Sequence, residues 1–353
     1  MKAVLCKSYG PPDSLVIEEV PSPPLAAGQV RIAVHACGVN FPDTLIIENK
    51  YQFKPDLPFS PGGEISGEVM EVAPDVDNVK PGDRVIGMCG WGGYAEELVM
   101  PARKVVKMPD GFDFPTAAAF TLTYGTSYHA LKQRADLKKG ESMLVLGASG
   151  GVGLSAVEIG KAFGARVVAA ASSDEKLEVC KAHGADEVIN YTTEDLRARA
   201  KELGGKNGFD VIYDPVGDKY AEPALRSIAW EGRYLVIGFA AGEIPKIPLN
   251  LVLLKGCQIV GVFWGSFTER EPALNFRNLD EMAEMVRNGT LKPHISATYP
   301  LEQAAKALND MKALLASGIA PTPETLQGAA EGISAVFDAI IPPAPEPDEK
   351  SGS

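Results

Sequence analysis

Cysteine, histidine and positive charge are scarce in this sequence, and each shortage excludes a class of protein. The 353 residues include 5 cysteines and 4 histidines, and no two cysteines have the C-x-x-C spacing of zinc ribbons or dithiol redox sites. We therefore expect free thiols in a reducing compartment rather than a disulfide scaffold. With 34 basic against 46 acidic residues, the net charge of -12 repels a phosphate backbone, so we expect no nucleic-acid partner.

Long apolar runs are also missing. The first residues reach Lys7 and a Gly-Pro-Pro turn too soon for the apolar stretch of a signal peptide, and no later segment is apolar enough to cross a bilayer. These features predict a cytoplasmic protein with no membrane partner. A hydrophobic share of 45% over this length is typical of a globular chain with two ordinary domains.

Two sequence patterns divide the chain into two parts. Up to about residue 119, short β-rich segments such as 29–36 and 67–73 are separated by glycine and proline, which is typical of an antiparallel, barrel-like unit. From about 120 to 265, apolar strands without alternation follow helix-length segments, which predicts a parallel sheet covered on both faces. The fold class is therefore α/β, with a doubly wound parallel sheet and a mainly antiparallel β unit.

A glycine-rich loop at residues 147–153 is the most informative segment. It follows an apolar strand at 142–146 and opens a helix expected at 154–163. At such a corner the chain turns sharply, approaches a pyrophosphate and packs the new helix closely against the strand. Each of these contacts leaves no room for a Cβ atom, which favours glycine. The N–H groups at the start of the helix attract the phosphate. The arrangement therefore predicts a dinucleotide site. The loop residues expected to contact the cofactor are Gly150, Gly151, Val152 and Gly153.

The end of the next strand indicates which dinucleotide binds. An NAD site usually has an acid there, about twenty residues after the loop, whereas this chain has Ser172 and a second serine. Small hydroxyl groups leave room for a 2′-phosphate, and Lys176 in the following helix supplies a cation. We therefore expect NADPH. The nearby Asp174 is interpreted as a helix N-terminal acid or cap rather than a ribose ligand.

Further motifs extend the pattern along the chain, at residues 37–43, 58–64, 125–131, 214–217 and 262–265. Together with the glycine loop they resemble the zinc-free quinone oxidoreductases of the medium-chain dehydrogenase/reductase superfamily, the group that includes zeta-crystallin. The resemblance runs from residue 1 to about 311. It implies a homodimer paired through edge strands near 259–263 and a division into domains. These are a GroES-like catalytic domain at 1–119 and 266–320, a Rossmann-type domain at 120–265, and an atypical C-terminal helix and Pro-rich tail at 321–353.

The same resemblance places the remaining site residues. Asn40, Asp43 and Thr126 are expected near the nicotinamide, and Tyr51 on the acceptor side. Tyr191 is expected to join Lys176 at the 2′-phosphate. Four residues match segments that pass close to the nicotinamide, and they follow buried strands at the carboxyl edge of the sheet, where such folds bind ligands. They are Gly238, Phe239, Phe263 and Trp264.

The catalytic zinc ligands of the related alcohol dehydrogenases are replaced in this chain. The positions of a ligating cysteine and histidine match Asn40 and Gly63, while Glu64 remains, and the four histidines fall in no ligand spacing. We therefore predict no metal. Without a Lewis acid, alcohol oxidation is disfavoured, whereas an acceptor that delocalises its own charge needs none.

These inferences predict an NADPH-dependent, metal-independent reductase that transfers a hydride to a quinone or another conjugated carbonyl. No residue stands out as an obligatory acid or base, so the proton is assigned to solvent or to a ribose hydroxyl. A reductase of 2-enoyl thioesters is an alternative with the same cofactor. A nucleotide-binding structural or RNA-contacting protein is an alternative of another class.

The sequence departs from the family pattern at two places. Members of the family end with a strand that returns to the first domain, whereas here apolar residues at helical spacing predict a helix over 325–341, so we expect the closing strand to be absent. In addition, Asp218 stands where the family commonly has a glycine after the 214–217 motif.

Overall fold

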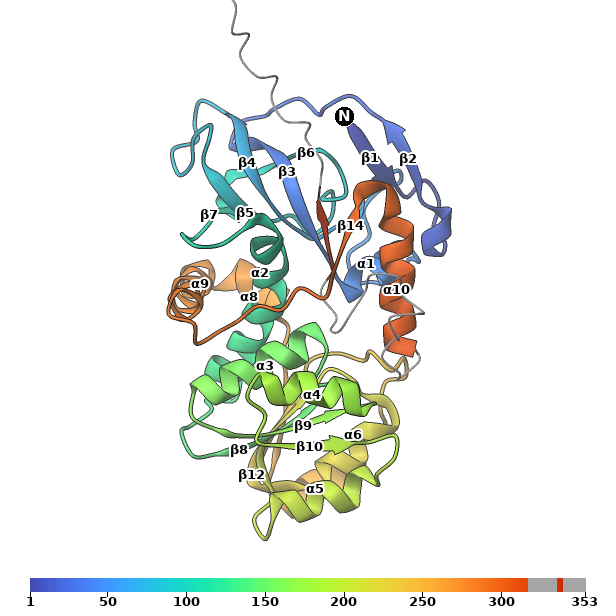
Figure 1. Ribbon diagram of the computed structural model, residues 1–353, viewed down its shortest axis with the longest axis vertical. Helices are drawn as coiled ribbons and strands as arrows, with labels where there is room; N and C mark the ends of the chain where they lie inside the picture. Colours follow the sequence, from blue (N-terminus) through green and yellow to red (C-terminus); the bar gives the residue numbers. More distant parts are fainter. Residues whose placement is uncertain (317–334, 339–353) are drawn as a thin grey trace, which may run out of the picture.

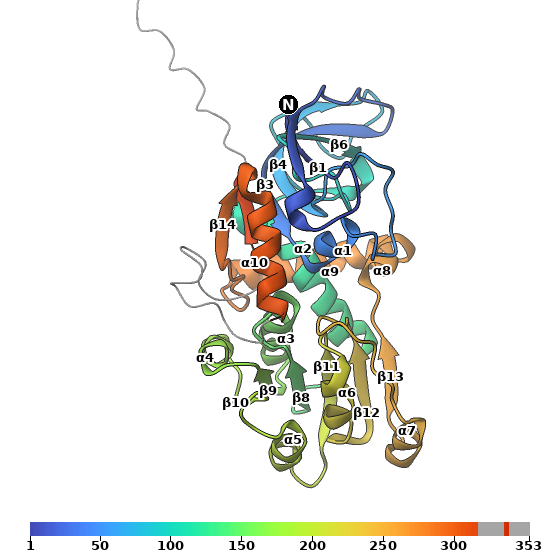
Figure 2. The ribbon, with the colours of Figure 1, turned by 90° about the vertical axis from the view of Figure 1, so that its right-hand side faces the viewer.

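The computed structural model describes residues 1–316 and 335–338. Two units built on separate β-sheets lie one above the other along the long axis, and helix α2 (Phe114–His129) runs between them (Figures 1 and 2). A hairpin of β1 (Lys2–Leu5) and β2 (Val16–Glu19) flanks the upper unit. None of the described helices combines the length and apolarity needed to cross a membrane.

The lower unit is a parallel sheet of six strands, which confirms the predicted doubly wound architecture. The chain builds outward from β8 to one edge and then from β11 to the other, so the strand order reverses between these two. Most residues of the central strands are buried because helices cover both faces. The strands are, in spatial order, β10 (Glu187–Asn190), β9 (Arg166–Ala171), β8 (Ser142–Leu146), β11 (Phe209–Asp214), β12 (Ile228–Val236) and β13 (Gln258–Gly261).

Helices of this unit connect successive strands, as parallel pairing requires. The helix after the glycine loop begins three residues earlier than predicted, at Gly151. The unit contains α3 (Gly151–Ala162), α4 (Asp174–Ala182), α5 (Leu196–Gly204), α6 (Asp218–Leu225) and α7 (Leu249–Lys255).

The upper unit is a mainly antiparallel sheet, as predicted. Its path runs β14-β15-β3-β4-β5-β7, and β6 pairs with β3 off this path. Its strands are β3 (Gln29–Val39), β4 (Glu64–Val72), β5 (Arg84–Met88), β6 (Glu97–Pro101), β7 (Val105–Lys107), β14 (Ala297–Pro300) and β15 (Ala335–Asp338). The remaining helices are α1 (Phe41–Ile46), α8 (Trp264–Arg270), α9 (Pro272–Arg287) and α10 (Ala304–Ala316).

A closing strand is present, so the prediction of its absence was wrong. Residues 335–338 form β15, which pairs in parallel with β14 and antiparallel with the end of β3. These four residues lie inside the segment predicted as a helix. A short apolar run is ambiguous between helix and strand, and two open strand edges favour the strand. The rest of the predicted helix and the Pro-rich tail lie outside the described residues.

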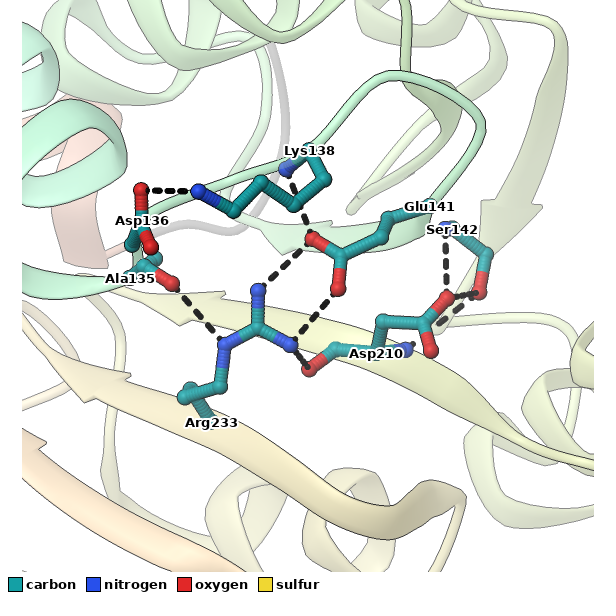
Figure 3. Close-up of polar contacts among 7 residues, drawn as sticks. All are labelled: Ala135, Asp136, Lys138, Glu141, Ser142, Asp210 and Arg233. Carbon is teal, nitrogen blue, oxygen red and sulfur yellow. Dashed lines mark hydrogen bonds and ion pairs between the residues drawn. The ribbon is translucent and has the colours of Figure 1, made fainter.

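Charged groups at the amino ends of the parallel strands pair with one another (Figure 3). The Arg233 guanidinium donates to both carboxylate oxygens of Glu141, at 2.9 and 2.7 Å, and to the carbonyl of Ala135 at 2.9 Å. The Asp210 carboxylate accepts from the backbone N–H and the hydroxyl of Ser142, at 2.8 and 2.9 Å. These charged groups therefore have partners within the protein. The candidate site lies at the opposite, carboxyl ends of the strands, where the glycine loop follows β8.

Candidate functional site

The glycine loop leaves β8 and opens α3 in a tight turn. Gly147 has a φ of +55°, which favours glycine, and a Cβ on Gly153 would lie 2.2 Å from the Gly147 carbonyl oxygen. The Leu154 N–H is the first of the helix to bond back, to the Gly150 carbonyl at 2.7 Å. The first three N–H groups of α3 therefore have no partner within the helix, and such groups are suited to bind an anion. They belong to Gly151, Val152 and Gly153.

Ser127 of α2 holds this helix start in place. Its hydroxyl donates to the Val152 carbonyl at 2.8 Å, and its oxygen lies 2.8 Å from the Ser155 hydroxyl and 2.7 Å from the Tyr213 hydroxyl. Ser127, Ser155 and Tyr213 are fully buried, so these contacts are costly to break. Sequence reasoning missed this network, although Ser127 lies inside a quoted motif, because only the fold brings α2, α3 and β11 together.

The three residues predicted at the 2′-phosphate lie together at the ends of β9 and β10. The Lys176 ammonium donates to the Ser172 hydroxyl at 3.0 Å, and the Tyr191 ring packs 4.6 Å from the Tyr220 ring, centroid to centroid. Burial raises the pKa of Tyr191 to about 12, which keeps its hydroxyl neutral, and lowers the pKa of Lys176. Asp174 lies in the first turn of α4, as predicted.

Asn40 is fixed by a buried carboxyl group that also contacts α2. The Asn40 side-chain amide donates to Glu64 Oε1 at 2.9 Å, and the Leu122 backbone N–H donates to Glu64 Oε2 at 2.8 Å. Thr126 lies one helical turn beyond Leu122 on α2. The structure therefore brings Asn40 and Thr126, both predicted at the nicotinamide, to the same stretch of this helix.

Asp43 is a second buried carboxyl group beside Asn40. It accepts from the backbone N–H groups of Asn40 at 2.8 Å and Gly62 at 3.2 Å, and from the Tyr94 hydroxyl at 3.3 Å. Burial raises the pKa of Asp43 to about 7 and that of Glu64 to about 8, although these donors partly offset the effect.

The described side chains around these two carboxyl groups form no cluster of three or more potential metal ligands. Zinc takes three or four thiolate, imidazole or carboxylate ligands, and no three such residues in the described ranges are arranged to hold an ion. Cys37 and Cys89 lie nearby, but burial raises the pKa of both thiols and opposes the thiolate form. The oxygens of Asp43 and Glu64 already accept hydrogen bonds from fixed donors.

Several of the predicted aromatic residues lie near this region, and one of them packs on α2. A Cβ on Gly125, the neighbour of Thr126, would lie 2.7 Å from the Trp264 ring, so the indole packs directly on the helix. The indole N–H is buried and has no hydrogen-bond partner among the described residues. Tyr51 is half-buried, and its ring lies 5.8 Å from that of Phe53, which in turn lies 6.5 Å from that of Phe263.

Gly238 and Phe239 pack against the turn that follows β11. A Cβ on Gly217 would lie 2.9 Å from the Phe239 ring, and the Gly238 N–H donates to the Asp214 carbonyl at 3.4 Å. Asp218 has a φ of +50°, a left-handed conformation that glycine adopts at no steric cost. This conformation is a physical reason for the glycine that relatives commonly have there.

Comparisons with known proteins cover both units. Residues 26–110 match the model of the alcohol dehydrogenase GroES-like domain, and residues 151–279 match that of the zinc-binding dehydrogenases. The chain is 44% identical over 310 residues to a quinone oxidoreductase-like protein 2 homolog of Nematostella vectensis, covering 87% of this chain and 84% of that protein. It is 35% identical over 309 residues to human quinone oxidoreductase, covering 87% and 92%.

Solved structures give the same result. The Escherichia coli quinone oxidoreductase complexed with NADPH superimposes with a TM-score of 0.85 at 26% identity, covering 96% of this chain and 100% of that one. A mycobacterial protein complexed with NADPH superimposes with a TM-score of 0.85 at 28% identity, covering 96% and 99%.

The raised pKa of Glu64 predicts a pH dependence of stability. The folded protein keeps this proton up to a pH of about 8, whereas the unfolded chain loses it near 4.5, so ionisation favours unfolding as the pH rises between these values. Replacing Glu64 by Gln removes this contribution, which amounts to about 1.4 kcal/mol per pKa unit. Urea unfolding at pH 5 and pH 8 is expected to show a smaller loss of stability in Glu64→Gln than in the wild type. Parallel pH profiles for the two proteins would contradict the raised pKa.

Proposed function

Because the chain belongs to the quinone oxidoreductase family of the medium-chain dehydrogenase/reductases, we propose that it is a metal-independent reductase that uses NADPH to reduce a quinone or another conjugated carbonyl. The observation that carries the proposal is the group formed by Ser172, Lys176 and Tyr191 at the end of β9, where an NAD enzyme would have an acid.

This group suits a phosphate. Burial alone lowers the pKa of Lys176, so its charged form is destabilised until an anion lies beside it. The Ser172 hydroxyl and the neutral Tyr191 hydroxyl are hydrogen-bond donors to phosphate oxygens. The free N–H groups at the start of α3 would hold the pyrophosphate in the same way. The residues present therefore fit NADPH.

Asn40, Thr126 and the unpartnered Trp264 N–H are the polar groups that we assign to the nicotinamide end. When bound, NADPH supplies a hydride. The reduction of a quinone consumes that hydride and one proton and yields the hydroquinone, and we assign the proton to solvent or to a ribose hydroxyl. The contribution of the protein is mainly to orient the reactants and to exclude water.

The donors around Asn40 support the proposed metal independence. The amide and Gly63 occupy the positions of two zinc ligands in related alcohol dehydrogenases, and Glu64 is bonded to Asn40 and to α2. No Lewis acid is then available for an alkoxide. A quinone, in contrast, spreads its developing charge over a conjugated ring, and the rings of Tyr51, Phe263 and Trp264 suit a flat acceptor.

We also propose that two copies of the chain pair along β13. This strand ends the parallel sheet, and it lies with α7 at one side of the lower unit (Figure 2). Large apolar side chains are exposed there, including Ile259 on β13 and Leu253 on α7, which is 79% exposed. When two copies are related by a two-fold axis beside this edge strand, the unpaired backbone N–H and C=O groups of one copy can bond to those of the other.

The activity itself is tested with purified protein and a panel of acceptors. We expect NADPH oxidation with ortho- and para-quinones that a strong zinc chelator leaves unchanged. Faster oxidation with crotonyl thioesters would favour a 2-enoyl thioester reductase. NADPH binding without oxidation by any acceptor would favour a structural role and refute the proposed activity.

Lys176→Glu tests the cofactor assignment. The substitution places a carboxylate where we assign the 2′-phosphate, so the Kd for NADPH is expected to rise roughly 30- to 100-fold, with that for NADH within about threefold. Lys181→Glu, the same charge change on an exposed position of α4, is the matched control. Fluorescence titration measures both constants, and an unchanged preference for NADPH in Lys176→Glu would refute the assignment.

Ile259→Lys tests the dimer. Two lysines brought together across the axis repel each other, so we expect a dimer in the wild type and a rise of about tenfold or more in its dissociation constant in the variant. Ile17, on the hairpin of the upper unit, is exposed to the same extent at 41% against 40%, and Ile17→Lys is the control. Sedimentation velocity measures the mass, and a monomeric wild type would contradict the proposal.

A further inference from the structure

Two serine hydroxyls link helices α2 and α3 by reciprocal hydrogen bonds. The Ser127 hydroxyl of α2 donates to the Val152 carbonyl of α3 at 2.8 Å. The Ser155 hydroxyl of α3 donates in the opposite direction, to the Thr123 carbonyl of α2 at 3.1 Å. Because each serine bonds to the backbone of the other helix, the C-terminal half of α2 and the start of α3 are held at a fixed spacing.

A tyrosine of β11 completes this serine–tyrosine cluster, which consists of Ser127, Ser155 and Tyr213. The Tyr213 hydroxyl lies 2.7 Å from the Ser127 oxygen. Burial raises the pKa of Tyr213, so its hydroxyl stays protonated and can donate. With Tyr213 as the donor, the Ser127 hydrogen is left for the Val152 carbonyl. The three side chains of the cluster are fully buried, so these bonds are shielded from water.

The carbonyl that accepts from Ser127 belongs to the same peptide group as the N–H of Gly153. That N–H is the third of the α3 groups without a partner within the helix, which we assign to the pyrophosphate. A hydrogen bond accepted by a peptide carbonyl polarises the whole group, and its N–H then becomes a stronger donor. The bond from Ser127 therefore both fixes and strengthens a donor for the phosphate.

The group that we assign to the 2′-phosphate lies on other elements. Ser172 and Lys176 follow β9, and Tyr191 follows β10, whereas the serine–tyrosine cluster belongs to α2, α3 and β11. The two parts of the cofactor site are therefore held by separate sets of contacts. A change confined to the cluster weakens the hold on the pyrophosphate and leaves the 2′-phosphate group intact.

We infer that Ser127 is a positioning residue for the pyrophosphate of the cofactor, because it holds the peptide group between Val152 and Gly153 in place. The inference rests on the cofactor placement in the proposed function. Ser127 itself is not a ligand, since it is fully buried and its hydrogen is donated to Val152. Its effect reaches the cofactor only through the start of α3, so a ligand without a pyrophosphate would not respond to its loss.

The test measures the binding of two cofactor fragments to Ser127→Ala. 2′-Phospho-ADP-ribose contains the pyrophosphate, whereas adenosine 2′-phosphate contains only the adenosine and the phosphate that we assign to Lys176. The Kd for 2′-phospho-ADP-ribose is expected to rise roughly five- to tenfold, the range of one lost hydrogen bond. The Kd for adenosine 2′-phosphate is expected to stay within about twofold. Isothermal titration calorimetry measures both constants.

Ser227→Ala is the matched control, because Ser227 is another buried serine of the lower unit and donates to a backbone carbonyl, that of Ala224, at 2.7 Å. It is expected to leave both Kd values unchanged. Tyr213→Phe removes one hydroxyl of the cluster but keeps the bond from Ser127 to Val152. This variant is expected to raise the Kd for 2′-phospho-ADP-ribose less than about threefold.

Three results would overturn the inference: equal rises for both fragments in Ser127→Ala, no rise for either, or a rise in Tyr213→Phe as large as that in Ser127→Ala. None of them concerns the acceptor, so the proposed activity is tested separately, by turnover of the wild type. A wild type that binds neither fragment overturns both the inference and the cofactor placement on which it rests.

Discussion

The arrangement of the site depends on the buried polar contacts of one helix, α2. Glu64 of the upper sheet accepts from the Leu122 N–H on one side, and Ser127 contacts Val152 and Tyr213 of the parallel unit on the other. Because α2 is packed between the two units, water does not reach these buried polar groups, and each needs a hydrogen-bond partner within the protein. The partners are the same elements that carry Asn40 and the glycine loop. One set of contacts therefore fixes both sides of the proposed cofactor site relative to each other.

Such fixed geometry matters most where no strong chemical group is available. The described residues around Asn40 offer no set of zinc ligands, and the oxygens of Asp43 and Glu64 are occupied by internal donors. In the proposed reaction, rate enhancement then comes from holding coenzyme and acceptor at the right distance and angle, which accounts for several kcal/mol in well-oriented reactions. In this proposal, a rigid α2 provides that precision, and flat aromatic side chains hold the acceptor.

The sequence was sufficient to predict an element or a site residue wherever the signal lies in a few adjacent residues. The glycine loop, the six parallel strands and the serine at Ser172 are each read from a few adjacent residues, and the structure places Lys176 beside that serine. It was insufficient where distant segments meet. The strand at 335–338 depends on the open edges of β3 and β14, and the contact between Phe53 and Phe263 depends on how two units pack. Neither has a signature in its own neighbourhood.

Hydride transfer adds negative charge to the acceptor. In an acidic protein, negative charges close to the acceptor would oppose this transfer. The chain carries a net charge of -12, and two carboxyl groups lie next to Asn40. Burial raises the pKa of Asp43 to about 7 and of Glu64 to about 8, so both are largely protonated in mildly acidic solution and add little negative charge there. At the cofactor end, Lys176 and the N-terminus of α3 supply local positive potential. The field at the site is therefore set by a few buried groups and differs from that of the surface, which allows an anionic coenzyme to bind an anionic chain.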